Sequence, residues 1–306
     1  MKRDKTESMM SRRDCLKTCL AGSAGLAVAP SLFASPAKTD IWVIHGEDKL
    51  KLMEAAFRVI GENGGFGKNV SSLAVKINAS WERRPEQGAN THPDLVEGFL
   101  TGYRNLGIQE VVLADFPCGG GPERTFTLSG IQDVANRRKA TLIGLKPGSE
   151  DFTDVTLPGA VQLKKARAAK VFLQADAVLN MPVAKSHHSS TVTISCKNWM
   201  GAVENRMYFH ATNLHQCIAD SCTLFKPAWT LIDATRVMMT GGPQGPSENM
   251  KYPNMIILSK DQVAADFYTA ELLVKDPLMV PHLKIAKAMG LGETDKARMN
   301  IIKKEA

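Results

Sequence analysis

The sequence predicts an α/β fold: a mostly parallel central sheet with flanking helices, Rossmann-like in type and elaborated at one edge. Short runs rich in Val and Ile alternate with longer amphipathic segments, an alternation typical of parallel sheets covered by helices. The chain has 306 residues, 44% of them hydrophobic and 23% charged, as in ordinary globular proteins. It contains no internal repeat and no low-complexity linker, so we expect residues 38–306 to form a single domain.

Seven apolar runs have the length and β-branched content of buried strands. In chain order these expected strands are Leu73–Ile77, Glu110–Ala114, Thr141–Leu145, Ala177–Asn180, Thr191–Ser195, Thr230–Asp233 and Met255–Leu258. The expected helices are Lys49–Ile60, Pro93–Leu106, Val161–Gln174, Asn213–Phe225, Ala264–Leu273 and Pro281–Met289. The second of these helices has a defined start, because Pro93 stands in the first turn and Asp94 lies beside the positive helix end.

The first 37 residues have the order of features found in an export signal. Residues Ser11–Lys17, which include Arg12 and Arg13, resemble the twin-arginine consensus, with Cys15 where Phe is usual. An apolar run over residues 20–33 follows, and then small residues up to Ala37 that suit a signal peptidase. We therefore expect residues 1–37 to direct export to the periplasm through the twin-arginine machinery. The alternative is a basic N-terminal tail.

The rest of the chain does not favour a membrane or nucleic-acid partner. The formal net charge of +7 falls to +4 without residues 1–37, and no stripe of Lys and Arg is present. No apolar stretch beyond residue 37 is long enough to cross a bilayer. Cys19 follows Lys17 and Thr18 instead of the apolar and small pair of a lipoprotein signal, so we expect no stable membrane anchor.

Four cysteines lie beyond the expected signal: Cys118, Cys196, Cys217 and Cys222. Cys217 and Cys222 are five positions apart in an expected helix, so their side chains point roughly 140° apart, and we expect both to be buried free thiols. The sequence leaves open whether Cys118 and Cys196 form a disulfide. Because the four cysteines are not closely spaced, we expect no iron–sulfur cluster, and the sequence predicts no other cofactor.

Polar side chains gather at the carboxyl ends of the expected strands, where ligands bind in open α/β sheets. These side chains are Lys76, Asn78, Asp115, Asn180, Lys185, His187, Lys197, Asn198 and Asp233. Loops are usually polar, so each of these residues taken alone is explained by a position in a solvent-exposed loop. Three lysines and two asparagines at three separate strand exits favour a shared pocket over coincidence.

Three lysines that converge on one cleft need an anionic partner, because clustered ammonium groups repel one another and lower each other's pKa values. The partner is either a ligand carboxylate or phosphate, or the side chains of Asp115 and Asp233. The glycine loops at residues 119–121 and 241–245 could direct backbone amides at an anion, although such loops also form plain turns. Neither loop matches a nucleotide-binding fingerprint.

The histidines leave metal binding open. His187 and His188 are adjacent, so in an extended segment they face opposite ways and only one of them joins a given site. A metal site would require His187 and His210 to converge with another ligand, and the spacing matches no known zinc pattern. Histidines of the surface or the core are the alternative.

The segment from residue 180 to 210 is similar to the central signature of the domain of unknown function 362 family. The matching positions are Asn180, Pro182, Lys185, His187, Lys197, Asn198, Gly201 and His210. The resemblance covers residues from about 70 to 295, with Ile77 and Ser186 as departures from the usual Pro and Thr. Many members of the family occur beside or fused to ferredoxin-like iron–sulfur modules, so the resemblance implies a redox role that the cysteine pattern of this chain does not support.

Two functions remain in view, together with a purely structural reading in which the lysines are solvated. The first is an exported enzyme or enzyme-like protein that binds a small anionic ligand, with Lys76, Lys185 and Lys197 holding the anion. Asn78 and Asn198 would then orient the ligand, with Asn180 and Asp233 also at the site, while His187 or Asp115 moves a proton. The second function is a non-catalytic assembly or electron-transfer partner of a periplasmic redox enzyme.

The twin-arginine hypothesis predicts that replacing both Arg12 and Arg13 by Lys strands the precursor in the cytoplasm. The pair of guanidinium groups is the feature that the export machinery reads, so a charge-conserving change should remove recognition. Cell fractionation with detection of the processed chain measures the outcome. Normal processing of the double variant in the periplasm would contradict the hypothesis.

Overall fold

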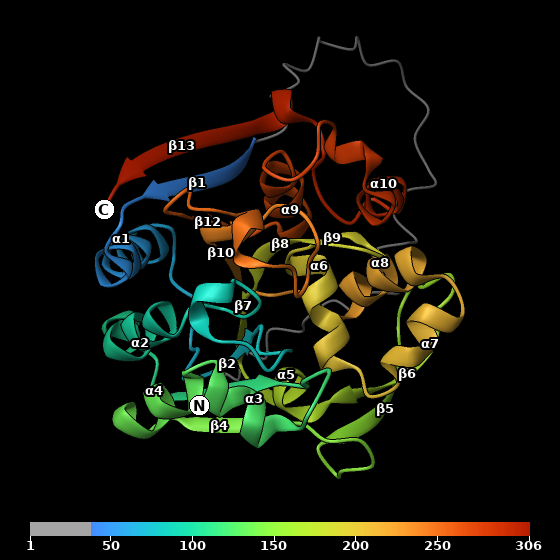
Figure 1. Ribbon diagram of the computed structural model, residues 1–306, viewed down its shortest axis with the longest axis horizontal. Helices are drawn as coiled ribbons and strands as arrows, with labels where there is room; N and C mark the ends of the chain where they lie inside the picture. The colour runs from blue at the N-terminus through green and yellow to red at the C-terminus, as the bar shows by residue number, and fades with distance from the viewer. Residues whose placement is uncertain (1–37) are drawn as a thin grey trace, which may run out of the picture. The chain divides into compact units, whose positions relative to one another are not determined.

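The structure, a computed structural model, describes residues 38–306 and has the predicted α/β architecture (Figure 1). In the described residues the main sheet has the strand order β13-β1-β12-β10-β7-β2-β3-β4. The bounds of these strands are β1 (Thr39–His45), β2 (Ser72–Ile77), β3 (Glu110–Asp115), β4 (Thr141–Gly144), β7 (Ala177–Met181), β10 (Trp229–Met238), β12 (Met255–Ser259) and β13 (Met299–Glu305).

The sheet is mainly parallel. Strands β10, β7, β2, β3 and β4 run parallel to one another, whereas β12 is antiparallel to both β10 and β1. Strand β8 (Val183–His187) runs parallel to β10 and forms a hairpin with β9 (Thr191–Thr193), and β11 (Met250–Lys251) also pairs with β10. A separate antiparallel ribbon of β5 (Phe152–Thr156) and β6 (Lys165–Ala169) follows edge strand β4 in the chain.

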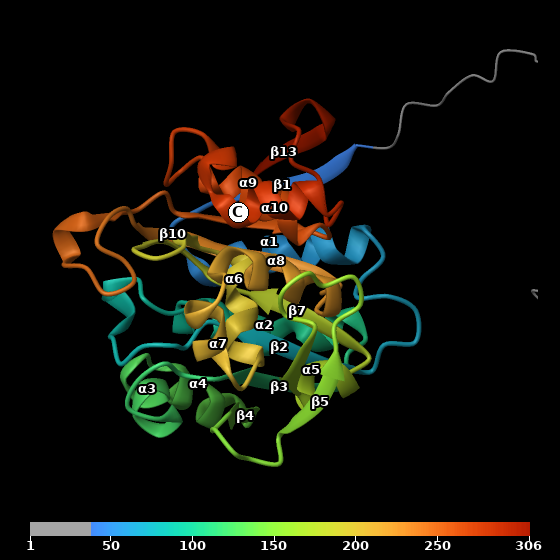
Figure 2. The same cartoon turned by 90° about the vertical axis from the view of Figure 1, so that its right-hand side faces the viewer.

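Helices cover both faces of the sheet (Figures 1 and 2). One group forms a hydrophobic core with one face of the sheet and comprises α1 (Lys49–Glu62), α2 (Pro93–Gly102) and α4 (Ile131–Arg138). The other group is α5 (Lys170–Gln174), α6 (Ser195–Asn198), α7 (Arg206–Ala211), α8 (Leu214–Leu224), α9 (Gln262–Ala270) and α10 (Pro281–Ala288). Helix α3 (Pro122–Leu128) leads from the end of β3 into α4.

The strands are buried on both faces, so each one contributes alternate residues to two cores. In β2, Leu73 and Val75 belong to the core under α1 and α2, while Ala74 belongs to the opposite core. Strand β12 divides in the same way, with Ile256 in one core and Ile257 in the other. This two-sided burial explains the nearly continuous apolar runs in the sequence.

The order of the parallel strands contains a switch point between β2 and β7. The chain proceeds outward from β2 to β3 and β4, and then returns to place β7 on the other side of β2. Connections that leave neighbouring strands in opposite directions open a crevice at their carboxyl ends. The residues after β2 and after β7 therefore border this crevice.

Most of the expected elements are confirmed. Each expected strand coincides with an observed strand over most of its length, and residues 49–60, 93–106, 213–225, 264–273 and 281–289 are largely helical. The start of α2 is as expected, and the His92 side chain also caps it by accepting a hydrogen bond from the backbone N–H of Asp94. The expected strand at residues 191–195 ends early, because Ser195 begins α6.

The helix expected at Val161–Gln174 is wrong over most of its length. Residues 165–169 instead form β6, and only residues 170–174 are helical. The buried Asp220 carboxylate in α8 accepts hydrogen bonds from the backbone N–H groups of Val161, Gln162 and Leu163 at 3.0, 2.7 and 2.7 Å. These bonds hold the segment away from the helix that its Leu, Lys and Ala content favours.

Asp220→Ala should destabilise the protein by roughly 2–5 kcal/mol, because it leaves backbone donors of the 161–163 segment without partners. The free energy of unfolding in urea measures this effect. Asp133→Ala is the matched control, since Asp133 is exposed and should cost less than about 1 kcal/mol. Equal stability of the two variants would contradict the anchoring role of Asp220.

Candidate functional site

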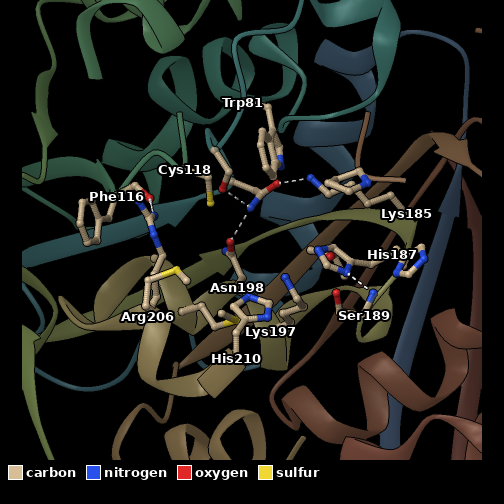
Figure 3. A pocket seen from close by; sticks show the side chains of 18 residues that line it. Trp81, Phe116, Cys118, Lys185, His187, Ser189, Lys197, Asn198, Arg206 and His210 are labelled. Carbon is tan, nitrogen blue, oxygen red and sulfur yellow. Dashed lines mark hydrogen bonds between the residues drawn. The ribbon is translucent and has the colours of Figure 1, made fainter. Parts of the chain in front are cut away.

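A cavity of about 450 Å³ opens at the switch point between β2 and β7 (Figure 3). Asn78 directly follows β2, Phe116 and Cys118 follow β3, and Lys185 and His187 belong to β8. The remaining lining residues are Ser80, Trp81, His188, Ser189, Thr193, Lys197, Asn198, Met200, Gly201, Arg206, Met207, His210 and Pro243. The cavity therefore lies at the carboxyl ends of the strands, where the sequence predicts it.

The charges around the cavity are of one sign. Lys185, Lys197 and Arg206 line it, and within residues 38–306 no Asp or Glu side chain does so. Part of the remaining wall is apolar, with Trp81 and Phe116 among its residues. A cavity with this lining suits a small ligand that has an anionic group and a hydrocarbon part.

Two asparagines connect the walls of the cavity. Asn78 Nδ2 donates to Asn198 Oδ1 at 2.9 Å, while Asn78 Oδ1 accepts from Lys185 Nζ at 2.7 Å. Asn198 in turn donates from Nδ2 to Asn180 Oδ1 at 2.8 Å. Asn180 is fully buried and lies outside the lining, so it acts on the cavity through Asn198. Because each amide is bonded on both sides, the orientations of Asn78 and Asn198 are fixed.

Lys76 and Asp115 form an ion pair behind the cavity wall. Their Nζ and Oδ1 atoms are 2.6 Å apart, and both side chains are fully buried. Lys76 also donates to Asn198 Oδ1 at 3.0 Å, and Asp115 accepts from the backbone N–H groups of Ala79 and Phe116. Burial lowers the pKa of Lys76, against the opposing effect of Asp115. Of the two kinds of partner that the sequence leaves open, Lys76 therefore has a carboxylate of the protein itself.

Asp233 also lies away from the cavity lining. It pairs with Arg236, with 2.6 Å between Oδ2 and Nη1, and both side chains are buried. Arg236 donates further to the backbone oxygens of Pro85 and Asn90, and Asp233 accepts from the N–H of His92 at 2.9 Å. This cluster fastens the segment between β2 and α2 to β10, and that segment carries Trp81 into the cavity wall.

Lys185 has the geometry of a proton-transfer group. Its fully buried Nζ donates to two neutral acceptors, Asn78 Oδ1 and the backbone oxygen of Ala89. An uncharged amine has two N–H donors and one lone pair, so these two bonds leave one position of Nζ that holds either a proton or a lone pair. Burial, with the nearby charge of Lys197, lowers the pKa of Lys185 to about 7.

His187 is suited to donate a hydrogen bond. Its Nδ1 accepts from the backbone N–H groups of Ser189 and Ser190 at 3.1 and 3.3 Å. Burial, together with Lys197 and Lys185, lowers its pKa to about 3, so the ring is neutral near pH 7. A neutral ring that accepts at Nδ1 carries its proton on Nε2. This geometry favours polarisation of a ligand oxygen over removal of a proton.

Lys197 and Arg206 supply the remaining positive charge. In the part of the chain that the structure describes, Lys197 Nζ has no hydrogen-bond partner, and burial followed by the charge of Arg206 lowers its pKa to about 8. Arg206 donates to the backbone oxygens of Phe116 and Pro117 and lies 4.0 Å from the centre of the Phe116 ring. Two of its five donors are thus occupied and the others remain available to an anion.

Some of the site residues predicted from the sequence line the cavity, and others do not. The residues that the cavity brings together are Asn78, Lys185, His187, Lys197, Asn198 and His210, whereas Lys76, Asp115, Asn180 and Asp233 lie behind its wall or away from it. Sequence reasoning missed Trp81, Cys118 and Arg206. The position of Cys118 after β3 could have indicated it, but Arg206 lies in a short helix with no sequence signal.

The expected absence of a bound metal and the alternative of a metal held by His187 and His210 both stay predictions. Among residues 38–306 no group of three or more His, Cys, Asp or Glu side chains is placed to hold a metal ion.

Cys118 is exposed and Cys196 buried, and both are free thiols, as are the buried Cys217 and Cys222. The expectation of free thiols at Cys217 and Cys222 is therefore confirmed. No helix in the described range combines the length and hydropathy needed for a membrane span.

The fold and the cavity define a Rossmann-like α/β protein with a cationic pocket at the switch point of its parallel sheet. Residues 73–271 match the model of the family described as Domain of unknown function (DUF362), and the chain belongs to this family. The resemblance seen in the sequence is thus confirmed. The match spans the elements from β2 to α9, and all the described residues that line the cavity lie within it.

Two proteins illustrate what the chain is similar to. The thylakoid-associated protein sll1697 of Synechocystis sp. is 22% identical over 243 residues, which cover 77% of this chain and 73% of that protein. The lactate racemase apoprotein from Thermoanaerobacterium thermosaccharolyticum has a TM-score of 0.49 and 12% identity, over 77% of this chain and 57% of that chain. This chain thus spans little more than half the length of that solved structure.

The lowered pKa of Lys185 predicts a pH-dependent stability. Below pH 7 both the folded and the unfolded chain carry the proton, whereas between about pH 7 and 10.5 only the unfolded chain does, so the free energy of unfolding should rise with pH. Relative to Lys185→Met, wild type should gain on the order of 2 kcal/mol between pH 7.5 and 9.5 in urea titrations. Lys275→Met is the control, since exposed Lys275 should not change the slope. Parallel curves for wild type and Lys185→Met would contradict a lowered pKa.

Proposed function

We propose that this protein binds a small organic anion in the cavity at the β2–β7 switch point and transfers a proton to or from it. The observation that supports this most strongly is the absence of Asp and Glu from the lining within the described residues, although Lys185, Lys197 and Arg206 all contribute to it. Uncompensated cations repel one another, and burial adds to the cost. A bound carboxylate or phosphate would relieve both effects.

The roles of the residues follow from how each one is held. Lys197 and Arg206 bind the anionic group, because each has donors that the protein leaves unused. Asn198 and Asn78 hold the neighbouring lysines in position, because their amide groups bond to Lys76, to Lys185 and to each other. Trp81 and Phe116 contact the hydrocarbon part. Lys76, Asp115, Asn180 and Asp233 support these groups from behind.

The proton-transfer step is assigned to Lys185, with His187 as a neutral donor to a ligand oxygen. Lys185 has one free position on Nζ and a pKa near 7, which is the range where an acid–base group is most effective at neutral pH. The sequence assigned this step to His187 or Asp115. Asp115 is now placed in an ion pair with Lys76, and this pairing favours Lys185 instead.

We further propose that the protein acts in the periplasm after export through the twin-arginine pathway. The expected signal falls on residues 1–37, which lie outside the described residues. The support is the order of paired arginines, apolar run and small residues in the sequence.

Anions should stabilise the wild-type protein through Lys197. The melting temperature should rise with the concentration of phosphate, sulfate or acetate, by an amount equivalent to about 2.7 kcal/mol at a hundred times the dissociation constant. Lys197→Met keeps the aliphatic stem and should abolish this rise while leaving stability without anions unchanged or slightly higher, because repulsion with Lys185 and Arg206 is relieved.

Differential scanning fluorimetry at constant ionic strength measures the shifts, with chloride as the screening control. Lys275→Met serves as the matched variant and should respond as wild type does. A large destabilisation of Lys197→Met, together with no anion dependence in wild type, would contradict the proposal. Such a result would mean that the lysines hold the fold and bind no anion.

A further inference from the structure

The Lys197 amine differs from the other two lysines near the cavity in having no partner. Lys76 donates to a carboxylate and two carbonyl oxygens, and Lys185 donates to two neutral acceptors. Among residues 38–306, Lys197 Nζ makes no hydrogen bond, although its side chain is only partly exposed. An amine in this situation has its lone pair free whenever it is unprotonated.

The backbone that carries Lys197 is firmly held. Lys197 belongs to α6, whose first residues are anchored by the buried Asp266 carboxylate: the N–H groups of Ser195 and Cys196 donate to it at 2.8 and 2.9 Å. On the other side, Asn198 is bonded to Asn180 and Asn78. The backbone of Lys197 is therefore fixed between two held neighbours, and its side chain reaches the cavity from a defined starting point.

The electrostatic surroundings keep part of the amine unprotonated. Burial and the charge of Arg206 lower the pKa of Lys197 to about 8, so a substantial fraction is neutral near pH 7.5, whereas an ordinary lysine with a pKa of about 10.4 is almost wholly protonated. Desolvation beside another cation is a recognised way to make a lysine nucleophilic. The absence of a nearby carboxylate within the described lining preserves this state.

The combination of a free amine and a cationic wall identifies a class of substrate. An amine reacts reversibly with a carbonyl carbon, and Arg206 has donors available for a carboxylate. The neutral Nε2–H of His187 is suited to polarise the carbonyl oxygen. A small 2-oxo acid carries both groups on adjacent carbons, and its short alkyl chain suits the apolar wall at Trp81.

We propose that Lys197 forms an imine with the carbonyl carbon of a small 2-oxo acid; this inference rests on the anion-binding function proposed above. The Nζ lone pair attacks the carbonyl carbon, the C–O π bond breaks as a C–N bond forms, and one of the two nitrogen-bound protons is transferred to the oxygen. The resulting carbinolamine loses its hydroxyl group and the remaining nitrogen-bound proton as water, which leaves a C=N bond. Nothing is oxidised or reduced. Lys185 is the group that exchanges protons during these steps.

Reductive trapping tests the imine. The full chain is incubated with pyruvate and sodium cyanoborohydride near pH 7.5, and the adduct is detected by intact mass and located by peptide mapping. Lys197 should be modified at least about tenfold faster than exposed Lys275, because a larger fraction of its amine is unprotonated. Acetone, which has the same methyl ketone without a carboxylate, should modify Lys197 at least about tenfold more slowly than pyruvate does.

The variants separate this inference from anion binding. Lys197→Met should lose the adduct, whereas Lys275→Met should keep it at Lys197. An adduct spread evenly over exposed lysines, or one located on Lys185, would overturn the assignment, and site mapping in wild type shows this even if a variant folds poorly. Anion stabilisation through Lys197 without an adduct would overturn the imine alone, and the loss of both would overturn the anion-binding function as well.

Discussion

The buried ion pair between Lys76 and Asp115 is the interaction on which the rest of the cavity depends. Two charges withdrawn from water cost several kcal/mol each, and this cost is offset only where the remaining donors and acceptors are also satisfied. Here Asp115 accepts from the backbone after β2 and after β3, and Lys76 donates to Asn198 of α6. The pair thereby joins three segments that form separate walls. Gly201 belongs to the same arrangement, because a Cβ there would lie 2.2 Å from Asp115 Oδ1.

The positive charge of the cavity follows from where the buried acids are used. Asp115 neutralises Lys76, Asp233 neutralises Arg236, and Asp266 holds the first residues of α6, with burial raising its pKa to about 6. Each carboxylate is thus committed to a contact behind the wall. The fold satisfies its internal acids locally, and the charge on Lys185 and Lys197 is left for something that enters from outside.

The sequence predicts the fold well where a single physical rule decides and poorly where distant contacts decide. Burial on both faces makes β2, β3, β7 and β12 recognisable as apolar runs, and of the polar residues that the sequence singles out, Asn78 after β2 lines the cavity together with Lys185 and Lys197. Residues 161–174 have helical propensity, but pairing with β5 and the hydrogen bonds to Asp220 override it. The sequence also does not predict which lysine forms an ion pair with a carboxylate. The distance from Lys76 to Asp115 depends on the strand order of the sheet and on the space left by Gly201.

The three lysines show how one residue type acquires different chemistry from the number of its partners. Lys76 is bonded to a carboxylate and two further oxygens, so its charge is fixed and serves the fold. Lys185 has two neutral acceptors, which leave one position on Nζ and a pKa near neutrality. Lys197 has no partner among the described residues, so any stabilisation of its charge must come from a ligand. The three lysines therefore range from structural support, through proton exchange, to ligand contact, and this order follows the number of protein partners that each amine has, with Lys76 alone paired to the Asp115 carboxylate.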